Sequence, residues 1–159
     1  MPLVTVDISD YQIADAPDDV LVTYALGSCI AVVIHDPVRK VGGMIHYMLP
    51  QSSVAPEKAA LKPAMFADTG VPLLFHAMYD RGCAKKGLVV KVVGGSKLYE
   101  DNGTFDIGRR NYVIVRQMLW KAGVVISAED VAGAKSRTTK LYVGSGRVTV
   151  RSANEEVDL

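Results

Sequence analysis

The pattern of apolar and polar residues predicts a chain built mainly of short strands. Some segments alternate apolar with polar residues, as half-buried strands do, and others are short continuous apolar runs. These segments are residues 3–8, 20–26, 30–34, 41–48, 87–95, 124–127, 138–143 and 147–151. Gly27 and Ser28 end the second run directly before Cys29. The residues Asp-Pro-Val-Arg at 36–39 favour a tight turn, so the third and fourth runs are expected to form a hairpin.

Two other segments have the apolar spacing of amphipathic helices. Residues 64–81 repeat apolar side chains at helical spacing, and Pro72 predicts either a kink or a restart within them. Residues 107–122 show the same spacing, with Asp106 suited to the N-cap and Gly123 to the C-cap. Strands outnumber helices and do not alternate strictly with them. The expected fold is therefore a layered α+β sandwich with mixed sheets and two main helices.

Two segments lack a strong periodicity. Residues 49–63 carry three prolines and are expected to form an exposed loop, either a functional rim or lid or a tolerated insertion. Residues 153–159 are a polar tail that is expected to fray. The remaining residues, 1–152, are long enough for one domain with a single core.

Composition and charge exclude several classes of protein. Hydrophobic residues make up 49% of the chain and the formal net charge is +1, without the basic stripe that nucleic-acid binding uses. No apolar run reaches the ~18 residues of a membrane span, and the N-terminus has no targeting signature, so a cytoplasmic protein without membrane insertion is expected. The two cysteines have no CxxC partner or clustered histidines, so neither a disulfide framework nor a metal site is expected.

The predicted hairpin brings a cysteine and a histidine together. With its turn centred between Pro37 and Val38, Cys29 and His46 are directly opposed neighbours whose Cβ atoms lie ~5 Å apart. A bulge or an odd-length loop would shift this register. His35 lies about 20 Å from Cys29 along the same strand, so it is not expected to act as a base for the thiol.

Cys29 has two interpretations. A free cysteine is usually a small buried hydrophobic residue, but a nearby imidazolium supplies the cation that a nucleophilic thiolate needs, and the pairing with His46 favours this second role. A tight turn at Gly27 and Ser28 could leave the backbone N–H groups of Ser28 or Cys29 free to bind an oxyanion. Thr23 on the preceding strand could orient the imidazole with its hydroxyl, although a β-branched strand residue more often serves packing.

The segments LGSC at 26–29 and HYMLP at 46–50, at this spacing, resemble the CheD family of chemoreceptor glutamine deamidases. The resemblance continues through FADTGVPLL, VVGGSKLYE and IGRRN to the last two strands, and so spans nearly the whole chain. It implies a three-layer α/β/β sandwich in which Cys29 is the nucleophile, His46 the general acid and base, and Thr23 the residue that positions the histidine. No metal or organic cofactor is implied.

The resemblance also implies a substrate and partners. The family hydrolyses side-chain carboxamides of specific glutamines on methyl-accepting chemotaxis receptors through a cysteine thioester, releasing ammonia, and it binds a CheC-type phosphatase. We expect the loop at 50–63 and the residues Gly94, Gly95 and Ser96 to form part of the rim that contacts these proteins.

Two residues depart from the family pattern. Ala132 stands in place of a glycine, so the loop that ends near Arg137 is expected to have a different shape, and Phe66 stands where tyrosine is common. Two other functions remain open from the sequence: a non-catalytic chemotaxis adaptor that binds receptors and CheC, and a thiol redox sensor that uses Cys29 and Cys83.

Overall fold

The computed structural model describes residues 2–98 and 105–159 of the chain. The strands are β1 (Leu3–Thr5), β2 (Asp10–Ala14), β3 (Val20–Leu26), β4 (Ile30–Asp36), β5 (Val41–Tyr47), β6 (Val89–Gly94), β7 (Ile126–Val131), β8 (Arg137–Tyr142), β9 (Val148–Ser152) and β10 (Glu155–Asp158). The α-helices are α1 (Pro56–Leu61), α2 (Ala67–Asp80) and α3 (Ile107–Lys121), and 3-10 turns occur at Ser52–Val54, Pro63–Met65 and Lys85–Gly87. Within the described ranges, every helix is too short or too polar to cross a membrane.

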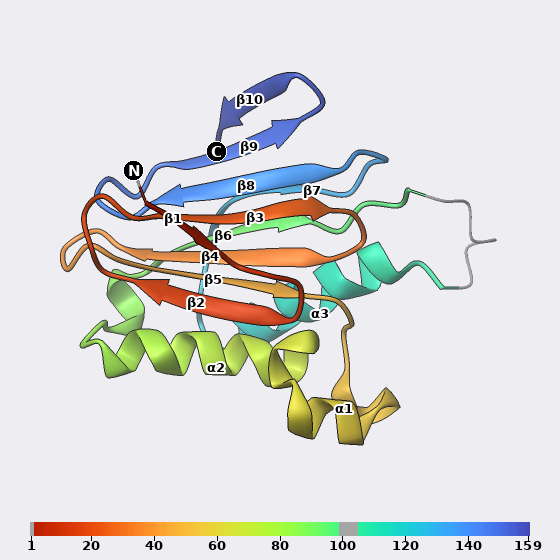
Figure 1. The fold of residues 1–159 in the computed structure, drawn as a ribbon. Coiled ribbons are helices and arrows are strands. Elements are labelled where there is room, and N and C mark those ends of the chain that lie inside the picture. The colour runs from red at the N-terminus through yellow and green to blue at the C-terminus, as the bar shows by residue number, and fades with distance from the viewer. Residues whose placement is uncertain (1, 99–104) are drawn as a thin grey trace.

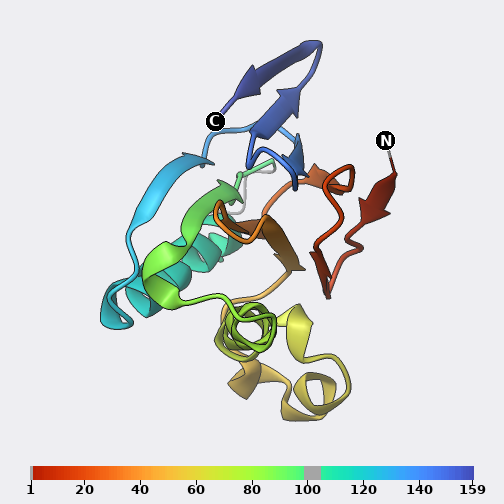
Figure 2. The same cartoon turned by 90° about the vertical axis from the view of Figure 1, so that its left-hand side faces the viewer.

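The elements form a three-layer α/β/β sandwich (Figure 1, Figure 2). One sheet has the strand order β2-β5-β4-β6-β7, and the other has the order β1-β3-β8-β9-β10. Both sheets are mixed, because β6 pairs parallel with β7 and β1 parallel with β3, while the other pairs are antiparallel. Helices α2 and α3 cover the outer face of the first sheet, and the second sheet packs on its inner face. The predicted layered α+β sandwich with two main helices is confirmed.

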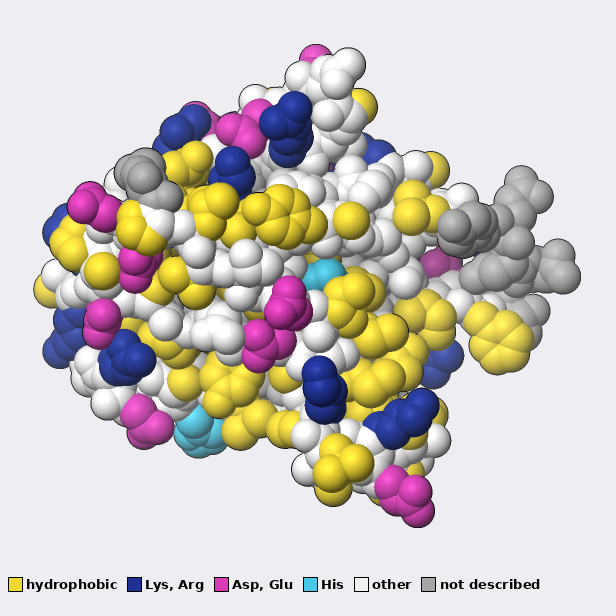
Figure 3. All heavy atoms as spheres, viewed as in Figure 1, with side chains coloured by type: hydrophobic (Ala, Val, Ile, Leu, Met, Phe, Trp, Pro, Cys, Tyr) yellow, Lys and Arg dark blue, Asp and Glu magenta, His cyan; other side chains and the backbone are white. Residues whose placement is uncertain are grey.

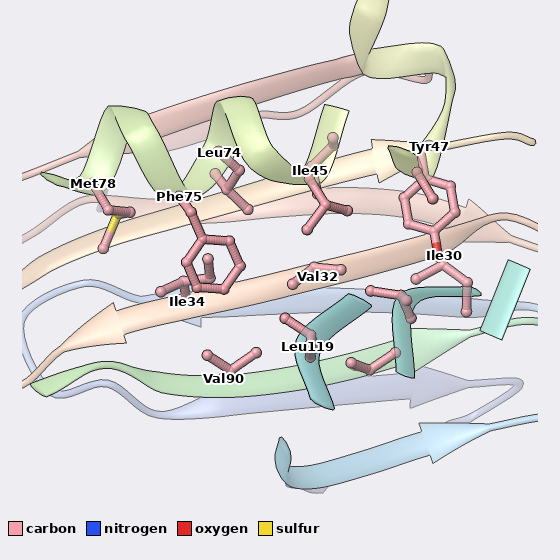
Figure 4. Packing of buried hydrophobic residues seen from close by; sticks show 14 of the residues in the cluster. Ile30, Val32, Ile34, Ile45, Tyr47, Leu74, Phe75, Met78, Val90 and Leu119 are labelled. Carbon is pink, nitrogen blue, oxygen red and sulfur yellow. The ribbon is translucent and has the colours of Figure 1, made fainter. Parts of the chain in front are cut away.

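Strand β4 is the centre of the middle layer and is buried on both faces. All of its residues are buried, which accounts for its continuous apolar sequence. Ile30, Val32 and Ile34 point toward the helices and pack with residues of α2 and α3 (Figure 4). The alternate residues Ala31 and Val33 face the second sheet. Because side chains alternate along a strand, β4 contributes to two separate cores.

The turn of the β4–β5 hairpin differs from the predicted one. It comprises the four residues Pro37–Lys40, and Asp36 pairs with Val41. The Asp36 carboxylate accepts hydrogen bonds from the backbone N–H groups of Val38 (2.9 Å) and Arg39 (3.1 Å). These bonds make Asp36 the last strand residue before the turn, instead of a residue inside it. The turn is therefore centred one residue later than predicted.

This difference moves every pair in the hairpin by two residues. Ala31, and not Cys29, lies opposite His46, so the prediction of direct opposition was wrong. Cys29 precedes the first residue of β4 and is a diagonal neighbour of His46. A shift of two residues preserves the side-chain alternation, so Cys29 stays on the same face of the sheet as His46.

Several segments are more ordered than the pattern predicted. The proline-rich segment contains α1, which begins at Pro56, a residue suited to the first helical position. Helix α2 runs through Pro72 without a restart. The polar residues 155–158 pair with β9 as strand β10 and do not fray. Residues 10–14, for which the pattern predicted no strand, pair with β5 as strand β2.

Helix α3 packs closely on the chain that leaves β6. Asp106 caps the helix as predicted, accepting a hydrogen bond from the backbone N–H of Arg109 (3.3 Å). A Cβ atom at Gly108 would overlap the carbonyl oxygen of Ser96 and lie 2.6 Å from that of Gly95. Both are backbone atoms, which no side-chain rotation can move aside. The absence of a side chain at Gly108 therefore sets the distance between α3 and residues 95–96.

We predict that Gly108→Ala destabilises the protein, although alanine is the better helix former. In an unobstructed helix this change stabilises by about 1 kcal/mol, whereas overpacking of this kind costs about 1–3 kcal/mol. Urea unfolding followed by circular dichroism should show a lower free energy of unfolding. The matched control is Gly87→Ala, whose Cβ would meet nothing within 4 Å. A Gly108→Ala variant as stable as the wild type would show that the helix has room for a side chain.

Candidate active site

The residues predicted to form the site meet at one end of the sandwich. The chain leaves β3, passes through residues 27–29 and enters β4 at this end, where β5 and β6 also finish (Figure 1). Helix α3 begins at the same end. Both sheets and the helical layer therefore contribute residues to one small region.

Thr23 and His46 form a hydrogen bond between the two sheets. Thr23 Oγ1 lies 2.7 Å from His46 Nδ1 and 2.6 Å from the carbonyl oxygen of Val6. The carbonyl can only accept, so the single hydroxyl proton of Thr23 is donated to Val6. His46 Nδ1 must then carry the proton that the Thr23 oxygen accepts. The free lone pair of the neutral imidazole is consequently on Nε2, which is the atom that can accept a proton from a thiol.

His46 is a buried neutral base. The residue is 1% exposed, and its Nε2 atom has no hydrogen-bond partner in the described part of the protein. Burial lowers the pKa of His46 to about 4, against a smaller opposing effect of the Asp7 carboxylate. An unpaired buried polar atom costs about 1–3 kcal/mol of stability. Folding stability therefore does not explain why a bare imidazole nitrogen is placed here.

Cys29 lies on the face of the middle sheet that holds His46. It packs against Leu26, Ala31 and Val93 between the sheets, and it is partly exposed. Burial raises the pKa of the Cys29 thiol, and a hydrogen bond from its own backbone N–H opposes this effect. The upward shift of the thiol pKa and the downward shift of the imidazole pKa both favour a neutral pair. The burial of both groups therefore disfavours the thiolate–imidazolium pair suggested by the sequence.

The turn that carries Cys29 is held by the residues that end β6. The Gly95 N–H donates to the carbonyl of Cys29 (2.9 Å), and the Ser96 N–H donates to the carbonyl of Gly27 (2.9 Å). Gly94 has a φ of +117°, and a Cβ atom there would overlap the Cys29 carbonyl oxygen, so glycine is required. Gly94, Gly95 and Ser96, predicted to line a rim, are buried and hold the turn in place.

The same turn presents two backbone donors. Within residues 2–98 and 105–159, no backbone carbonyl accepts a hydrogen bond from the N–H group of Ser28 or of Cys29. Both residues are partly exposed, so a ligand can reach them. The Cys29 N–H lies close enough to its own sulfur to affect the thiol pKa. If the Cys29 sulfur attacked a carbonyl group, the carbonyl oxygen would need N–H donors beside the sulfur, where these two groups lie.

A buried arginine connects this turn to the loop after β7. The side chain of Arg137 is 2% exposed and donates to Ser96 Oγ (2.6 Å), Asp130 Oδ1 (3.1 Å) and the Ala132 carbonyl (2.8 Å). Ala132 has a φ of +66°, a left-handed conformation that costs a non-glycine residue about 1–2 kcal/mol. The loop thus adopts a glycine-like conformation despite the alanine, with the arginine bonds to offset the strain.

The other cysteine and the other histidines lie away from this end. The Cys83 thiol interacts with Asp36, which lies at the opposite end of β4, about 23 Å from Cys29 at about 3.3 Å per residue. This separation is too large for a disulfide, which contradicts the redox-sensor interpretation. His35 is buried and bonded to a backbone carbonyl (2.7 Å), while His76 is exposed on α2.

Asn111 of α3 is a site residue that the sequence analysis missed. Its side-chain amide donates to the carbonyls of Ser28 (2.9 Å) and Met48 (2.8 Å). It shares the buried face of α3 with Val115 and Leu119. A polar residue on this apolar face was the available signal in the sequence.

Comparison with known proteins points to one family. Residues 48–152 match the family model for CheD, described as CheD chemotactic sensory transduction. The chain is similar to the probable chemoreceptor glutamine deamidase CheD 2 of Anaeromyxobacter dehalogenans (strain 2CP-C), with 51% identity over 159 residues and 100% of both chains covered. It is also similar to the probable chemoreceptor glutamine deamidase CheD 1 of Syntrophus aciditrophicus (strain SB), with 50% identity over 150 residues and 94% of each chain covered.

The similarity extends to a relative with lower identity. The probable chemoreceptor glutamine deamidase CheD of Methanococcus vannielii is 34% identical over 151 residues, covering 94% of this chain and 95% of the relative. The family model begins to match after His46, and the similarity to the three relatives extends over the region before it. On the model match and on the similarity over its whole length, the chain belongs to the CheD family.

Proposed function

We propose that this protein hydrolyses the side-chain carboxamides of specific glutamines on methyl-accepting chemotaxis receptors, giving glutamate and ammonia. Relatives similar over 94% to 100% of the chain are named as probable chemoreceptor glutamine deamidases. One observation carries the proposal. The imidazole of His46 is fixed through Nδ1 by Thr23, and its bare Nε2 lies on the sheet face shared with Cys29.

The first step starts from the neutral pair. Nε2 of His46 takes the proton of the Cys29 thiol while the sulfur attacks the carbonyl carbon of the glutamine side chain. The carbonyl π electrons move to the oxygen, and the N–H groups of Ser28 and Cys29 bind the resulting oxyanion. Proton transfer during the attack avoids a stable charged pair in a buried site.

The intermediate then releases ammonia. The imidazolium of His46 protonates the amide nitrogen, the C–N bond breaks, and a thioester remains on Cys29. Neutral His46 next removes a proton from a water molecule as the water oxygen attacks the thioester. The sulfur leaves and recovers its proton from His46, so each turnover consumes one water and releases one ammonia. These steps use no metal or organic cofactor.

We assign substrate selection to the surface around the turn, because one carboxamide offers too few contacts to distinguish glutamines. Tyr24 at the end of β3 and Leu98 after β6 are exposed apolar side chains. Hydrophobic side chains also gather near the end of β5 and above α1 (Figure 3). The segment 50–63, with exposed Val54 and Leu61, extends this surface. An amphipathic receptor helix would supply complementary apolar contacts beside its glutamine.

The resemblance to the family suggests a second partner for the same end of the molecule. A CheC-type phosphatase bound over the Cys29 turn would exclude a receptor helix from it. We place this exchange in the cytoplasm, where the signalling helices of the receptors lie.

Replacing Cys29 should abolish deamidation, and replacing Cys83 should not. A receptor cytoplasmic fragment is incubated with each protein, and peptide mass spectrometry reads the amide-to-acid mass gain at each glutamine. Cys29→Ala should give only the background rate, because no sulfur remains to form the thioester. Cys83→Ala is the matched control, since it removes a buried thiol at the other end of β4.

Two results would contradict the proposal. Wild-type protein that binds cognate receptors but produces no mass gain would favour the non-catalytic adaptor. A gain that persists in Cys29→Ala would place the nucleophile elsewhere.

The pH profile of kcat/KM should lack an ionisation near the ordinary histidine pKa of about 6.5. Burial lowers the pKa of His46 to about 4, so the base stays unprotonated in mildly acidic solution. The pH dependence of kcat/KM reports the pKa values of groups in the free enzyme. It should therefore be flat between about pH 5.5 and about pH 8 and fall only below about pH 5. An acidic limb centred near about pH 6.5 would show that His46 is not a buried neutral base.

Protein stability must be checked across the same profile. The His46 pKa is lower in the folded than in the unfolded state, so the unfolded chain gains its proton first as the pH falls. Above about pH 6.5 His46 is neutral in both states and does not change the free energy of unfolding. As the pH falls toward about 4, protonation of the unfolded chain lowers the free energy of unfolding by up to about 3 kcal/mol. Circular dichroism at each pH separates unfolding from protonation of the base.

Thr23→Val should lower kcat on the order of 100-fold, near the lower end of what general-base catalysis contributes. Valine has nearly the same shape but cannot accept the His46 Nδ1 proton, so the Nδ1-protonated tautomer loses its support. Thr23→Ser keeps the hydroxyl and should recover most of the activity. The mass-spectrometric assay measures both variants. Equal kcat values for the valine and serine variants would show that the hydroxyl does not orient the base.

A further inference from the structure

Asn111 is a polar side chain in a position suited to an apolar one. It is the fifth residue of α3 and is completely buried on the inward face of the helix. Its Oδ1 atom is buried without a hydrogen-bond partner in the described residues. An unpaired buried carbonyl costs about 1–3 kcal/mol, so packing alone does not account for this amide.

The neighbours of Asn111 fix the orientation of its amide. Two carbonyl oxygens face the same end of the side chain, that of Ser28 at 2.9 Å and that of Met48 at 2.8 Å. Carbonyl oxygens only accept, so this end is the NH₂ group, and both of its protons are used. Asn111 therefore has no side-chain donor left to bind a substrate. Asn111 must therefore act through the two segments that its amide binds.

One of those segments carries the proposed oxyanion donor. The Ser28 carbonyl and the Cys29 N–H belong to the same peptide group, and the described residues contain no cis peptide bond. In a trans peptide, the C=O and N–H bonds point in opposite directions. By holding the Ser28 carbonyl against α3, Asn111 turns the Cys29 N–H away from the helix.

The flanking peptides are held in the same way by backbone groups. The Gly27 carbonyl binds the Ser96 N–H, and the Cys29 carbonyl binds the Gly95 N–H. The three consecutive carbonyls of the turn thus each have a donor from the protein interior. The middle carbonyl, that of Ser28, accepts its hydrogen bond from the Asn111 side chain. Of the three contacts, this is the one that a point mutation can delete without altering the backbone.

The second segment follows the catalytic histidine along the chain. Met48 lies two residues after His46, and its carbonyl shares the Asn111 amide with Ser28. One side chain therefore joins the turn of the nucleophile to the strand of the base. Its position on α3 depends on the close contact of Gly108 with the Gly95 and Ser96 carbonyls.

We propose that Asn111 is a positioning residue that orients the Ser28–Cys29 peptide so that its N–H can bind the oxyanion. This inference rests on the proposed deamidase function. Asn111 touches neither substrate nor reacting atoms. It acts in the transition state, where the carbonyl oxygen of the substrate becomes negatively charged, and it contributes little to binding the uncharged glutamine.

Asn111→Leu should lower kcat of glutamine deamidation by about 100-fold, the loss typical of a misplaced oxyanion donor. KM should change by less than about threefold, because the interaction is made only in the transition state. Tyr47→Phe is the matched control. It deletes the buried hydroxyl that donates to the Asn111 backbone carbonyl (2.5 Å) but leaves the side-chain amide in place. This control should keep most of its kcat.

A second variant keeps the test valid where the leucine prevents folding. Asn111→Asp has the same shape, and a carboxyl group protonated by burial can donate to only one of the two carbonyls. It should lose kcat in the same direction. Alkylation of Cys29 by iodoacetamide forms no oxyanion, so its rate should stay within about threefold of wild type in both Asn111 variants. A purely structural role would lower alkylation and deamidation together and would overturn the proposal.

Nuclear magnetic resonance tests the positioning without any substrate. In ¹⁵N–¹H spectra of Asn111→Leu or Asn111→Asp, the amide peaks of Ser28 and Cys29 should shift and broaden, and in Tyr47→Phe they should remain sharp. Unchanged peaks in the Asn111 variants, or a kcat that is unaffected, would overturn the inference. If the wild-type protein deamidates nothing but the Asn111 variants still show these amide changes, the proposed function is refuted and the role of Asn111 in orienting the Ser28–Cys29 peptide is retained.

Discussion

The hydrogen bond between Thr23 and His46 forms only if the two sheets pack in one fixed relation. Thr23 belongs to β3 of the outer sheet and His46 to β5 of the middle sheet. The apolar core between these sheets, which includes Leu21, Val33 and Met44, holds them at the required offset. The water that this packing excludes would otherwise stabilise the imidazolium, so the same core lowers the pKa of His46. The position and the lowered pKa of the proposed base, His46, therefore both depend on the core between the sheets.

A neutral base changes what the rest of the site must supply. In a solvated cysteine–histidine pair, the imidazolium lowers the thiol pKa and a thiolate is present before the substrate binds. Burial moves both pKa values in the other direction here. In the proposed mechanism, the reaction then depends on proton transfer during the attack and on N–H donors already directed at the developing oxyanion. The three interior contacts to the carbonyls of residues 27–29 meet this need without adding a charged group.

The sequence was sufficient to place Cys29 and His46 on one face of a hairpin, because side-chain alternation tolerates an error of two residues. The error itself came from Asp36, whose carboxylate closes the turn through local hydrogen bonds that an apolar pattern does not encode. The tautomer of His46 depends on the Val6 carbonyl, and the orientation of the Ser28 carbonyl depends on Asn111. Both contacts join segments far apart in the chain, so only the assembled layers reveal them.

The site carries a stability cost that the rest of the fold must offset. His46 Nε2 and Asn111 Oδ1 are both buried and unpaired in the described residues, at about 1–3 kcal/mol each. Apolar side chains of similar size would remove both penalties, which supports the functional roles proposed for these two residues. The offset comes from the continuous apolar middle layer, where β4 is buried on both faces. Strand β4 contributes to two cores and can therefore support a polar site at its end, because the turn that carries Cys29 leads directly into it.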